Sequence, residues 1–381
     1  HGGHRGKHKI LRVLCVLCSE QIKDRMEKNA KIYVAGHHGL VGSAIWKNLQ
    51  DKGYTNLVGR THKELDLLDG VAVRKFFDEE QPEYVFLAAA FVGGIMANSI
   101  YRADFIYKNL QIQQNVIGES FRHNVKKLLF LGSTCIYPRD AEQPMKEDVL
   151  LTSPLEYTNE PYAIAKIAGL KMCESFNLQY GTNYIAVMPT NLYGPNDNFD
   201  LERSHVLPAM IRKIHLAHCL KEGNWEAVRK DMNLRPVEGV NGDSPKEEIL
   251  AILQKYGISE TEVTLWGTGT PLREFLWSEE MADASVFVME HVDFKDTYKE
   301  GDKDIRNCHI NIGTGKEITI RQLAERIVET VGYQGKLTFD SSKPDGTMRK
   351  LTDPSKLHSL GWHHKIEIEE GVQRMYEWYL K

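Results

Sequence analysis

The stretch Lys31-Ile-Tyr-Val-Ala-Gly-His-His-Gly-Leu-Val-Gly42 decides the fold of this chain. Its apolar start predicts a buried strand at 31–35, and apolar residues recur at helical spacing over 40–51. Glycines between the two allow a tight turn and close approach to a phosphate at a helix N-terminus, where amide donors favour anions. A glycine triplet also suits a plain strand-to-helix turn, but its place here favours a dinucleotide site.

Short apolar runs alternate with helical stretches beyond this motif, as in a parallel sheet covered by helices. The predicted fold class is therefore α/β, with a Rossmann-type doubly wound parallel sheet. We expect strands at 56–59, 83–89, 127–131 and 184–188, and helices at 71–80, 103–123 and 162–180. We expect the dinucleotide-binding lobe to span 31–192 with a return around 273–315, and the smaller α/β substrate-binding lobe to span 193–272 and 316–381. A surface helical insertion is expected at about 219–262.

Composition limits the partners of the chain. Its net charge of -4 gives no broad positive field for nucleic acid or anionic lipid, and no apolar stretch approaches the ~20 residues that span a bilayer. Small-molecule partners are therefore expected, with no nucleic acid and no membrane. Six irregularly spaced cysteines predict reduced thiols in a cytoplasmic protein. Cys15 and Cys18 have the spacing of a metal knuckle but lack a second pair, so no metal site is expected.

Residues 1–30 are basic and then briefly apolar, and we expect a mobile N-terminal extension without a catalytic role. A signal peptide is the alternative, but Arg12 interrupts the apolar run and no small-residue cleavage site follows.

The end of the second predicted strand reads Gly59-Arg60-Thr61-His62-Lys63. An enzyme that prefers NAD needs a carboxylate there for the free ribose hydroxyls, whereas positive donors suit a 2′-phosphate. This segment therefore favours NADP(H), with a solvated basic loop as the alternative.

The segment Tyr162-Ala-Ile-Ala-Lys166 places a phenol and an ammonium group on one face of a helix. The ammonium favours the phenolate and so lowers the pKa of the tyrosine, which can then pass a proton to a carbonyl oxygen as hydride reaches the carbon. Ser133, after the strand that ends at Leu131, provides a second hydrogen bond to that oxygen. Together these residues resemble the catalytic set of the extended short-chain dehydrogenases/reductases.

Cys135 follows that serine, and His205 lies downstream in Ser204-His205. A thiol and an imidazole suit a sugar C3/C5 epimerase, because a C4 ketone acidifies the neighbouring carbons and inversion needs proton removal and return. A core thiol and a surface histidine are the alternatives for each residue taken singly.

From about Lys31 to the C-terminus, apart from 219–262, the chain resembles the GDP-L-fucose synthase family of extended short-chain dehydrogenases/reductases. The stretches that carry the resemblance are Ala35–Ala44, Leu87–Ala90, Val92–Ile95, Gly132–Pro138, Thr158–Lys166, Met188–Pro195, Ser204–Val206, Trp266–Phe275 and Ser342–Gly346. The resemblance implies NADPH-dependent conversion of GDP-4-keto-6-deoxy-D-mannose to GDP-L-fucose, by 3,5-epimerisation and then 4-keto reduction. It also implies a homodimer paired through 103–123 and 162–180.

The resemblance assigns Ser133, Tyr162 and Lys166 to reduction, and Cys135 and His205 to epimerisation. Residue patterns and resemblance together assign cofactor binding to Gly36, His37, His38, Gly39, Leu40, Val41, Gly42, Arg60, His62, Lys63, Asp66, Leu67, Leu131, Gly132, Ser133, Thr134, Lys166, Pro189, Thr190, Asn191, Leu192 and His205. The GDP-sugar is assigned to Lys213, Trp266, Arg273 and Asp345.

Two matters stay open at this level. His38 and His62 stand where relatives often carry arginines for the 2′-phosphate, so the preference for NADPH over NADH depends on Arg60 and Lys63 or is weaker. Rival functions are a 4,6-dehydratase or 4-epimerase of the same fold, which Cys135 with His205 disfavours, and a non-catalytic NADP-binding sensor, which the intact Tyr162 and Lys166 disfavour. The sequence leaves open which of Cys135 and His205 is the base.

Overall fold

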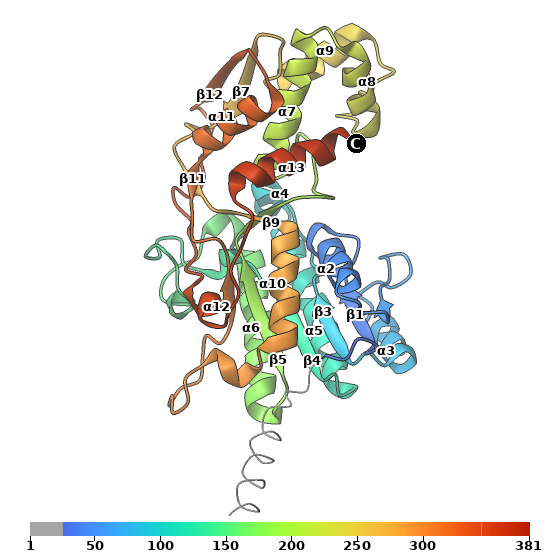
Figure 1. Cartoon of the computed structure of the whole chain (residues 1–381), viewed down its shortest axis with the longest axis vertical. Coiled ribbons are helices and arrows are strands. Elements are labelled where there is room, and N and C mark those ends of the chain that lie inside the picture. The colour runs from blue at the N-terminus through green and yellow to red at the C-terminus, as the bar shows by residue number, and fades with distance from the viewer. Residues whose placement is uncertain (1–25, 344) are drawn as a thin grey trace, which may run out of the picture.

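A computed structural model describes residues 26–343 and 345–381 (Figure 1). At its centre is a six-stranded parallel sheet in the order β10-β5-β4-β3-β1-β2. The strands are β1 (Ile32–Ala35), β2 (Leu57–Val58), β3 (Tyr84–Leu87), β4 (Lys127–Leu131), β5 (Tyr184–Pro189) and β10 (Ile310–Ile312). Strand order reverses beside β1, as in a doubly wound fold, and the predicted fold class is confirmed.

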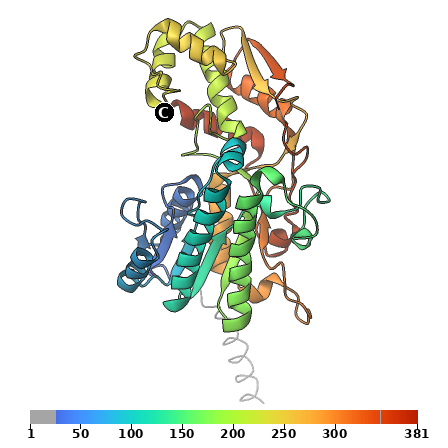
Figure 2. The same cartoon turned by 180° about the vertical axis from the view of Figure 1, so that it is seen from behind.

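Helices cover both faces of this sheet, so β1, β3, β4, β5 and β10 are buried along their whole lengths. One face packs against α2 (Leu40–Asp51) and α10 (Ser278–His291) (Figure 1). The opposite face packs against α3 (Gly70–Glu80), α5 (Arg102–Arg122) and α6 (Glu160–Tyr180) (Figure 2). The expected helices at 71–80, 103–123 and 162–180 are thus present within two residues of their predicted ends.

Local sequence explains where the site-bearing helix α6 begins and ends. Pro161 lies in its first turn, where the missing N–H costs nothing, and Gly181 ends it in the left-handed conformation with φ 68°. The short 3-10 turn η3 (Tyr157–Asn159) leads into it. Tyr162 therefore lies in the first turn of α6, and Lys166 follows one turn further into the sheet-facing core.

The chain returns to the sheet late in the sequence. After β9 (Phe275–Trp277), α10 packs against α2, and β10 then pairs with β5 in parallel through Ile310 and Val187. The 3-10 turn η4 (Phe294–Thr297) lies between α10 and β10.

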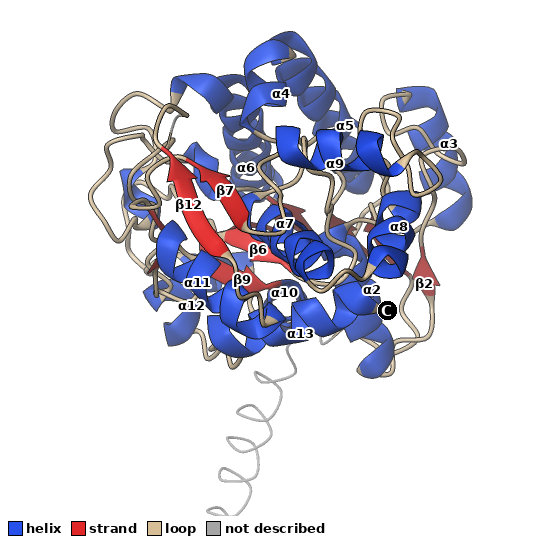
Figure 3. Cartoon of the chain, turned by 90° about the horizontal axis from the view of Figure 1, so that it is seen from above, coloured by secondary structure: helices blue, strands red, loops and turns tan. Residues whose placement is uncertain are grey.

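The other elements form a second lobe above the carboxyl ends of the central strands (Figure 3). Its parallel pairs are β7 with β12 and β6 with β9, and β8 pairs with β11 in antiparallel fashion. Its elements are β6 (Asn191–Tyr193), α7 (Val206–Lys221), α8 (Trp225–Leu234), α9 (Lys246–Lys255), β7 (Glu262–Trp266), β8 (Leu272–Arg273), β11 (Ile318–Thr319), α11 (Ile320–Val331), β12 (Lys336–Asp340) and α13 (Ile368–Leu380). Shorter elements elsewhere are α4 (Ile95–Ile100), η1 (Thr134–Ile136), η2 (Glu147–Val149) and α12 (Ser355–Ser359).

The segment 219–262, expected as a surface insertion, contributes to the core of this second lobe. Val228 and Met232 of α8 and Ile249 of α9 are fully buried with residues of α7, α11 and α13. Asp231 of α8 accepts a hydrogen bond from Nε of the fully buried Arg212 at 2.8 Å. Both helices are amphipathic, and each buries its apolar face against α7 or its neighbours.

Several expectations concern residues outside this description. Residues 1–25, which were predicted to be mobile and which include Cys15 and Cys18, lie outside the described residues. The four cysteines within the described ranges are free thiols. No helix within those ranges is both long and apolar enough to span a membrane.

Candidate active site

The loop between β1 and α2 is shaped for a close approach to an anion. Gly36 has φ +85°, and a side chain there would lie 2.9 Å from the backbone nitrogen of Ala89. A side chain at Gly42 would lie 2.0 Å from the carbonyl oxygen of Gly36. The N-terminal amides of α2 have no side-chain cap and are open to a ligand. The loop therefore fits a dinucleotide diphosphate.

The positive residues at the end of β2 differ in whether their charge is already paired within the protein. Arg60 donates from Nη1 to the carbonyl oxygen of Gly59 at 2.9 Å and pairs through Nη2 with Glu80. Its charge is therefore already engaged. His62 and Lys63 are exposed, with His62 Nδ1 3.7 Å from the Asp66 carboxylate. Leu67, the next predicted contact, is half-buried and accepts at its carbonyl oxygen from Asn115 at 2.8 Å.

His37 and His38 bring the glycine-rich loop against this strand end. The two rings lie 4.0 Å apart between centroids, and the His37 ring packs so closely on Gly59 that a side chain there would approach it to 2.6 Å. Burial lowers the pKa of His37, and the neighbouring His38 lowers it further. His38 is exposed and lies at the same edge. The structure therefore places two imidazoles at the end of β2, where the ribose is predicted to bind: His37, whose pKa is lowered by burial, and the exposed His38.

The carboxyl ends of β4 and β5 form the floor of the candidate site. Gly132 packs so tightly on Met188 that a side chain there would lie 2.2 Å from the methionine sulfur. Thr190, after the last β5 residue Pro189, donates its N–H to Ile312 at 3.0 Å. Asn191 donates to the carbonyl oxygen of Glu274 at 2.8 Å. Leu192, partly buried, packs on the same side.

Four predicted catalytic residues meet where β4 ends and α6 begins. Ser133 precedes η1, and its Oγ accepts from the backbone N–H of Cys135 at 3.3 Å. Lys166 Nζ donates to the carbonyl oxygen of Leu131 at 2.7 Å and lies 5.7 Å from the Tyr162 ring centroid. The Cys135 thiol acts electrostatically on both Tyr162 and Lys166. The tertiary structure thus brings Ser133, Cys135, Tyr162 and Lys166 together.

Burial decides the charge states in this cluster. It raises the pKa of Tyr162 above its ordinary value, and Cys135 acts in the same direction, so the lowering expected from Lys166 does not decide the sign. Burial lowers the pKa of Lys166 to about 8, and Cys135 opposes that change. Burial also raises the pKa of the Cys135 thiol. Tyr162 is therefore a protonated phenol near neutral pH, as a proton donor to a carbonyl oxygen must be.

His205 and Lys213 lie on one helix of the second lobe. His205 occupies the N-cap position of α7, and its side chain is exposed, yet the surrounding protein lowers its pKa by desolvation. Lys213 lies about two turns further along α7 and is 7% exposed, and burial lowers its pKa to about 8. No hydrogen bond joins His205 to Cys135 in the part of the chain described, so the pairing of the two is not made by direct contact.

The predicted GDP-sugar residues line a second edge. Trp266 ends β7 with 60% of its surface exposed, and Lys343 Nζ lies 5.6 Å from its ring centroid. Asp345 accepts from the backbone N–H of Thr268 at 2.7 Å and from its hydroxyl at 2.8 Å. Arg273 Nη1 donates to the carbonyl oxygen of Leu272 at 2.8 Å. Burial lowers the pKa of Arg273, and Asp345 opposes this.

Two residues of the site were missed from sequence. Glu274 is fully buried and accepts hydrogen bonds from Thr314, Gly315 and Thr352. It thereby joins its own segment to two others, one at 314–315 and one at 352. Lys350 acts electrostatically on Cys135 and Arg273. Glu274 stands inside the quoted stretch Trp266–Phe275, and its charge beside an arginine was the available signal. Lys350 had no sequence signal, because only folding brings 350 to 135.

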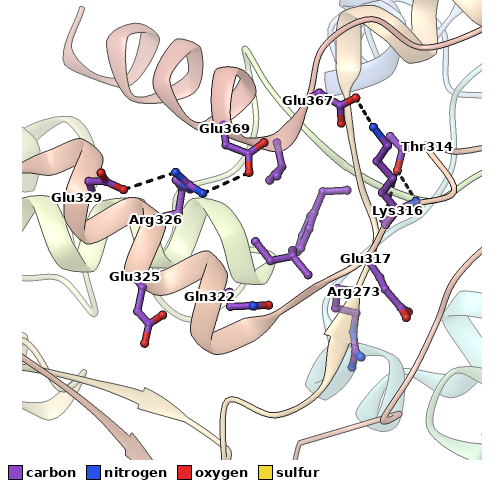
Figure 4. A pocket seen from close by; sticks show the side chains of 13 residues that line it. Arg273, Thr314, Lys316, Glu317, Gln322, Glu325, Arg326, Glu329, Glu367 and Glu369 are labelled. Atoms are coloured by element: carbon purple, nitrogen blue, oxygen red, sulfur yellow. Dashed lines mark hydrogen bonds and ion pairs between the residues drawn. The ribbon is translucent and has the colours of Figure 1, made fainter.

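A hollow in the second lobe has Arg273 among its lining residues. It measures about 510 Å³ and is bordered by α11, α13 and β11 (Figure 4). Its ion pairs join Arg326 to Glu369 at 3.3 Å and to Glu329 at 3.5 Å, and Lys316 pairs with Glu367. The Arg273 side chain points away from these pairs in Figure 4. Carboxylates dominate the lining, which disfavours a diphosphate there.

Comparisons with known proteins show the family of the chain. The model of the "NAD dependent epimerase/dehydratase family" matches residues 32–235 and 230–313. "GDP-L-fucose synthase 1" of Arabidopsis thaliana is 50% identical over 95% of this chain and 96% of its own, and "GDP-L-fucose synthase" of Escherichia coli (strain K12) is 48% identical over 92% and 97%. The solved structure of "MlghC, GDP-mannoheptose C4 reductase from Campylobacter jejuni with NADP bound" superposes with TM-score 0.82 and 47% identity, over 93% of this chain and all of that one.

Proposed function

The chain belongs to the NAD dependent epimerase/dehydratase family, among the GDP-L-fucose synthases, and from that premise we propose how its site makes GDP-L-fucose. The chain is an oxidoreductase and epimerase that uses a nicotinamide cofactor. It converts GDP-4-keto-6-deoxy-D-mannose to GDP-L-fucose by 3,5-epimerisation and then reduction of the 4-ketone. The observation that supports the residue roles is that Ser133, Cys135, Tyr162 and Lys166 meet where β4 ends and α6 begins.

The reduction step needs a proton donor at the ketone oxygen. Tyr162 is protonated near neutral pH, so its phenol can donate that proton, and Ser133 Oγ can donate a second hydrogen bond to the same oxygen. Lys166 Nζ donates to the carbonyl oxygen of Leu131 at 2.7 Å and lies 5.7 Å from the Tyr162 ring centroid, and in this proposal its ammonium group would also hold the cofactor ribose. NADPH, when bound, supplies the hydride.

The epimerisation step needs groups that remove and return protons at C3 and C5. The ketone at C4 acidifies both positions, because the negative charge of the resulting enolate resides on the C4 oxygen. In this proposal Cys135, in the turn η1 after β4, and His205, at the N-cap of α7, act on the bound ring from separate elements. Inversion of a carbon requires that a proton is removed on one face of the ring and returned on the other. Which of the two is the base at each carbon is left to experiment.

The cofactor is NADPH rather than NADH in this proposal. The glycine cradle at Gly36 and Gly42 fits the diphosphate, and the exposed cationic or titratable groups at the adenosine end are His38, His62 and Lys63. Arg60 is tied to Glu80, so its contribution to a 2′-phosphate requires that ion pair to open.

The GDP-sugar is held by the second lobe in this proposal. Arg273 offers a forked donor for the diphosphate. Lys213 offers an ammonium group whose pKa burial lowers to about 8, and a bound diphosphate would favour its charged form. Trp266 presents an exposed apolar face for the base or the sugar. Asp345 is fixed by Thr268 and retains lone pairs for hydroxyl or amino groups.

We further propose a cytoplasmic homodimer. α5 and α6 pack against each other and leave apolar groups exposed on their outer faces, among them Tyr107 at 68%, Ile164 at 43% and Leu178 at 51% (Figure 2). Pairing these helices with those of a second copy would bury that surface. The free thiols of the described cysteines suit a reducing compartment.

One assay tests the function. The purified chain is supplied with GDP-4-keto-6-deoxymannose and NADPH in deuterated water, and the products are identified by NMR. GDP-L-fucose with deuterium at C3 and C5 is the expected result. A 6-deoxy sugar with unchanged C3 and C5 would make the chain a C4 reductase only, while no NADPH oxidation at all would favour a binding protein.

A further inference from the structure

Ring contacts position the Tyr162 side chain, because its hydroxyl makes no hydrogen bond to any residue in the ranges 26–343 and 345–381. The Phe105 and Tyr162 rings meet edge to face at 87°, with their centroids 6.1 Å apart. Lys166 Nζ lies 5.7 Å from the centroid of the same tyrosine ring. An edge-to-face pair at this separation is attractive and holds the plane of one ring against the other. Phe105 therefore orients the phenol through its ring.

Phe105 is itself held in place at the start of α5. It is 1% exposed, and the Phe91 ring packs on it with the centroids 4.9 Å apart at 67°. Asn109, one turn further along the helix, donates to the Phe105 carbonyl oxygen at 2.7 Å. A side chain at Gly93 would lie 3.1 Å from the Phe105 ring, so the segment after β3 covers that ring closely. The position of this ring is thus fixed by packing on both its backbone and its side chain.

The first turns of α5 and α6 are also joined to each other, and the two helices lie side by side (Figure 2). Arg102 Nη1 donates to the carbonyl oxygen of Tyr157 at 2.8 Å, and its guanidinium group lies 4.4 Å from the Tyr157 ring centroid. Arg102 Nη2 lies 3.7 Å from the Glu160 carboxylate at the start of α6. These contacts hold the spacing between the helix that carries Phe105 and the helix that carries Tyr162.

The segment after β3 connects this aromatic contact to the dinucleotide loop. A side chain at Gly36 would lie 2.9 Å from the backbone nitrogen of Ala89, so the two loops are in contact. Two residues later, the Phe91 N–H donates to Asn109 Oδ1 and the Phe91 carbonyl oxygen accepts from Asn109 Nδ2, both at 2.9 Å. Asn109 is 2% exposed, so it satisfies these backbone groups inside the protein. A continuous chain of contacts thus runs from the dinucleotide loop through Phe91 to the tyrosine of α6.

We propose that Phe105 is a positioning residue for the reduction, which holds the Tyr162 phenol in line with the C4 oxygen of the bound sugar. The proposal rests on the proposed role of Tyr162 as the proton donor. Hydride from NADPH adds to C4, the electron pair of the C–O π bond takes the phenol proton, and solvent returns a proton to the phenolate. The O–H must point at the C4 oxygen during this transfer. A displacement of about 1 Å costs up to roughly 100-fold in rate, so the ring that sets the direction of the phenol sets the rate of the step.

The test is a double-mutant cycle on the first-turnover rate of NADPH oxidation with GDP-4-keto-6-deoxymannose. Phe105→Leu keeps an apolar side chain but removes the ring, and the rate should fall about 10- to 100-fold. KM for the GDP-sugar and Kd for NADPH should stay within about threefold, because Phe105 holds the tyrosine and not the ligands. In Tyr162→Phe the hydroxyl is already absent, so adding Phe105→Leu should lower the residual rate by less than about threefold.

An isotope effect identifies the step that is slowed. With NADPH deuterated at the transferred position, the isotope effect on the Phe105→Leu rate should be at least as large as that of the wild type, because hydride and proton transfer then limit the turnover. Loss of folded protein alone would lower the amplitude of the turnover and leave the isotope effect unchanged.

Phe121→Leu is the matched control. Phe121 and Phe176 form the same kind of contact between α5 and α6, with ring centroids 5.0 Å apart at 61°, farther along both helices. Its loss should leave the rate within about twofold of the wild type. Circular dichroism and NADPH titration show which variants are folded.

A second variant carries the test if Phe105→Leu does not fold. Phe91→Leu removes the half-buried ring that supports Phe105 and should lower the rate by about 3- to 10-fold, again only while the Tyr162 hydroxyl is present.

Three outcomes would overturn the proposal. One is a folded Phe105→Leu protein whose rate falls no more than that of Phe121→Leu. Another is an equal loss from Phe105→Leu with and without the Tyr162 hydroxyl, which would make Phe105 a core residue only. The third is a loss confined to KM for the GDP-sugar. Near-normal turnover of Tyr162→Phe alone would refute the proposed role of Tyr162, and the positioning role of Phe105 would be refuted with it.

Discussion

Glu274→Gln is the substitution whose effect can best be worked out from contacts. One carboxylate oxygen of Glu274 accepts from the N–H groups of Thr314 at 2.6 Å and Gly315 at 2.8 Å and from the Thr314 hydroxyl at 3.3 Å. The other oxygen accepts from the N–H and hydroxyl of Thr352 at 2.9 and 2.6 Å. Glutamine keeps the volume but replaces one oxygen with an NH₂ group. That NH₂ group must face either the Thr314 and Gly315 donors or the two Thr352 donors. On each side only the threonine hydroxyl can turn to accept a hydrogen bond, so backbone N–H groups are left facing a donor.

The loss is therefore at least one and at most two charge-assisted hydrogen bonds, together with a donor facing a donor. At about 1.5 to 3 kcal/mol for each such bond, the free energy of unfolding should fall by roughly 2 to 5 kcal/mol. The site should suffer as well, because Thr352 lies two residues from Lys350 and Glu274 is next to Arg273. We expect a higher KM for the GDP-sugar and a lower kcat.

The assay is urea unfolding at fixed pH, followed by circular dichroism and analysed by linear extrapolation. The matched control is Glu325→Gln on α11, where the carboxylate is exposed and the change should stay within about 0.5 kcal/mol. A loss in Glu274→Gln no larger than in Glu325→Gln would refute the reasoning, since it would mean that the five donors find water or other acceptors at no cost.

Four further results are expected. Tyr162→Phe should lower turnover by about 10² to 10⁴ while NADPH binding, followed by fluorescence, stays nearly unchanged; near-normal turnover would remove Tyr162 from the mechanism. Cys135→Ser should lose deuterium uptake at C3 and C5 yet still oxidise NADPH and give an unepimerised 6-deoxy sugar; exchange at the wild-type rate would make Cys135 a packed thiol only. Lys213 has a pKa lowered to about 8, so its charge disappears as pH rises through that value and KM for the GDP-sugar should rise above it; a Lys213→Met variant that keeps the same KM profile from pH 7 to pH 9 would contradict this. Shortening 219–262 to a brief loop removes Asp231 from buried Arg212 and should destabilise the second lobe; a stable, fully active deletion would show that this buried pair is dispensable.

Much of the first lobe was predictable from local pattern. A strand buried on both faces needs an uninterrupted apolar run, and a glycine-rich turn between a strand and a helix has few other purposes. The helix with Tyr162 and Lys166 could be placed because a four-residue spacing puts both on one face. The second lobe was harder, because its strands are short, β8 and β11 having two residues each, and their pairing joins distant segments.

Charge states were the part of the site that sequence could not predict. Tyr162 beside Lys166 suggested a lowered phenol pKa, yet burial acts on both groups and raises the pKa of the phenol. Arg60 looked free for a phosphate, but α3 brings Glu80 to it. In both cases the deciding neighbour or the deciding solvent exclusion comes from packing of elements that are separate in the chain.

The sequence by itself determined the parallel sheet, the dinucleotide cradle and the identity of the serine, tyrosine, lysine, cysteine and histidine, since these depend on residue type and short-range spacing. Only the tertiary structure decided which charges act on which groups. Lys166 of α6 donates to Leu131 at the end of β4, and Glu274 joins Thr314 to Thr352, so neither contact exists until these separate segments are packed together. Short-range spacing cannot encode such contacts, because the free energy that forms them is gained by burying whole elements against one another.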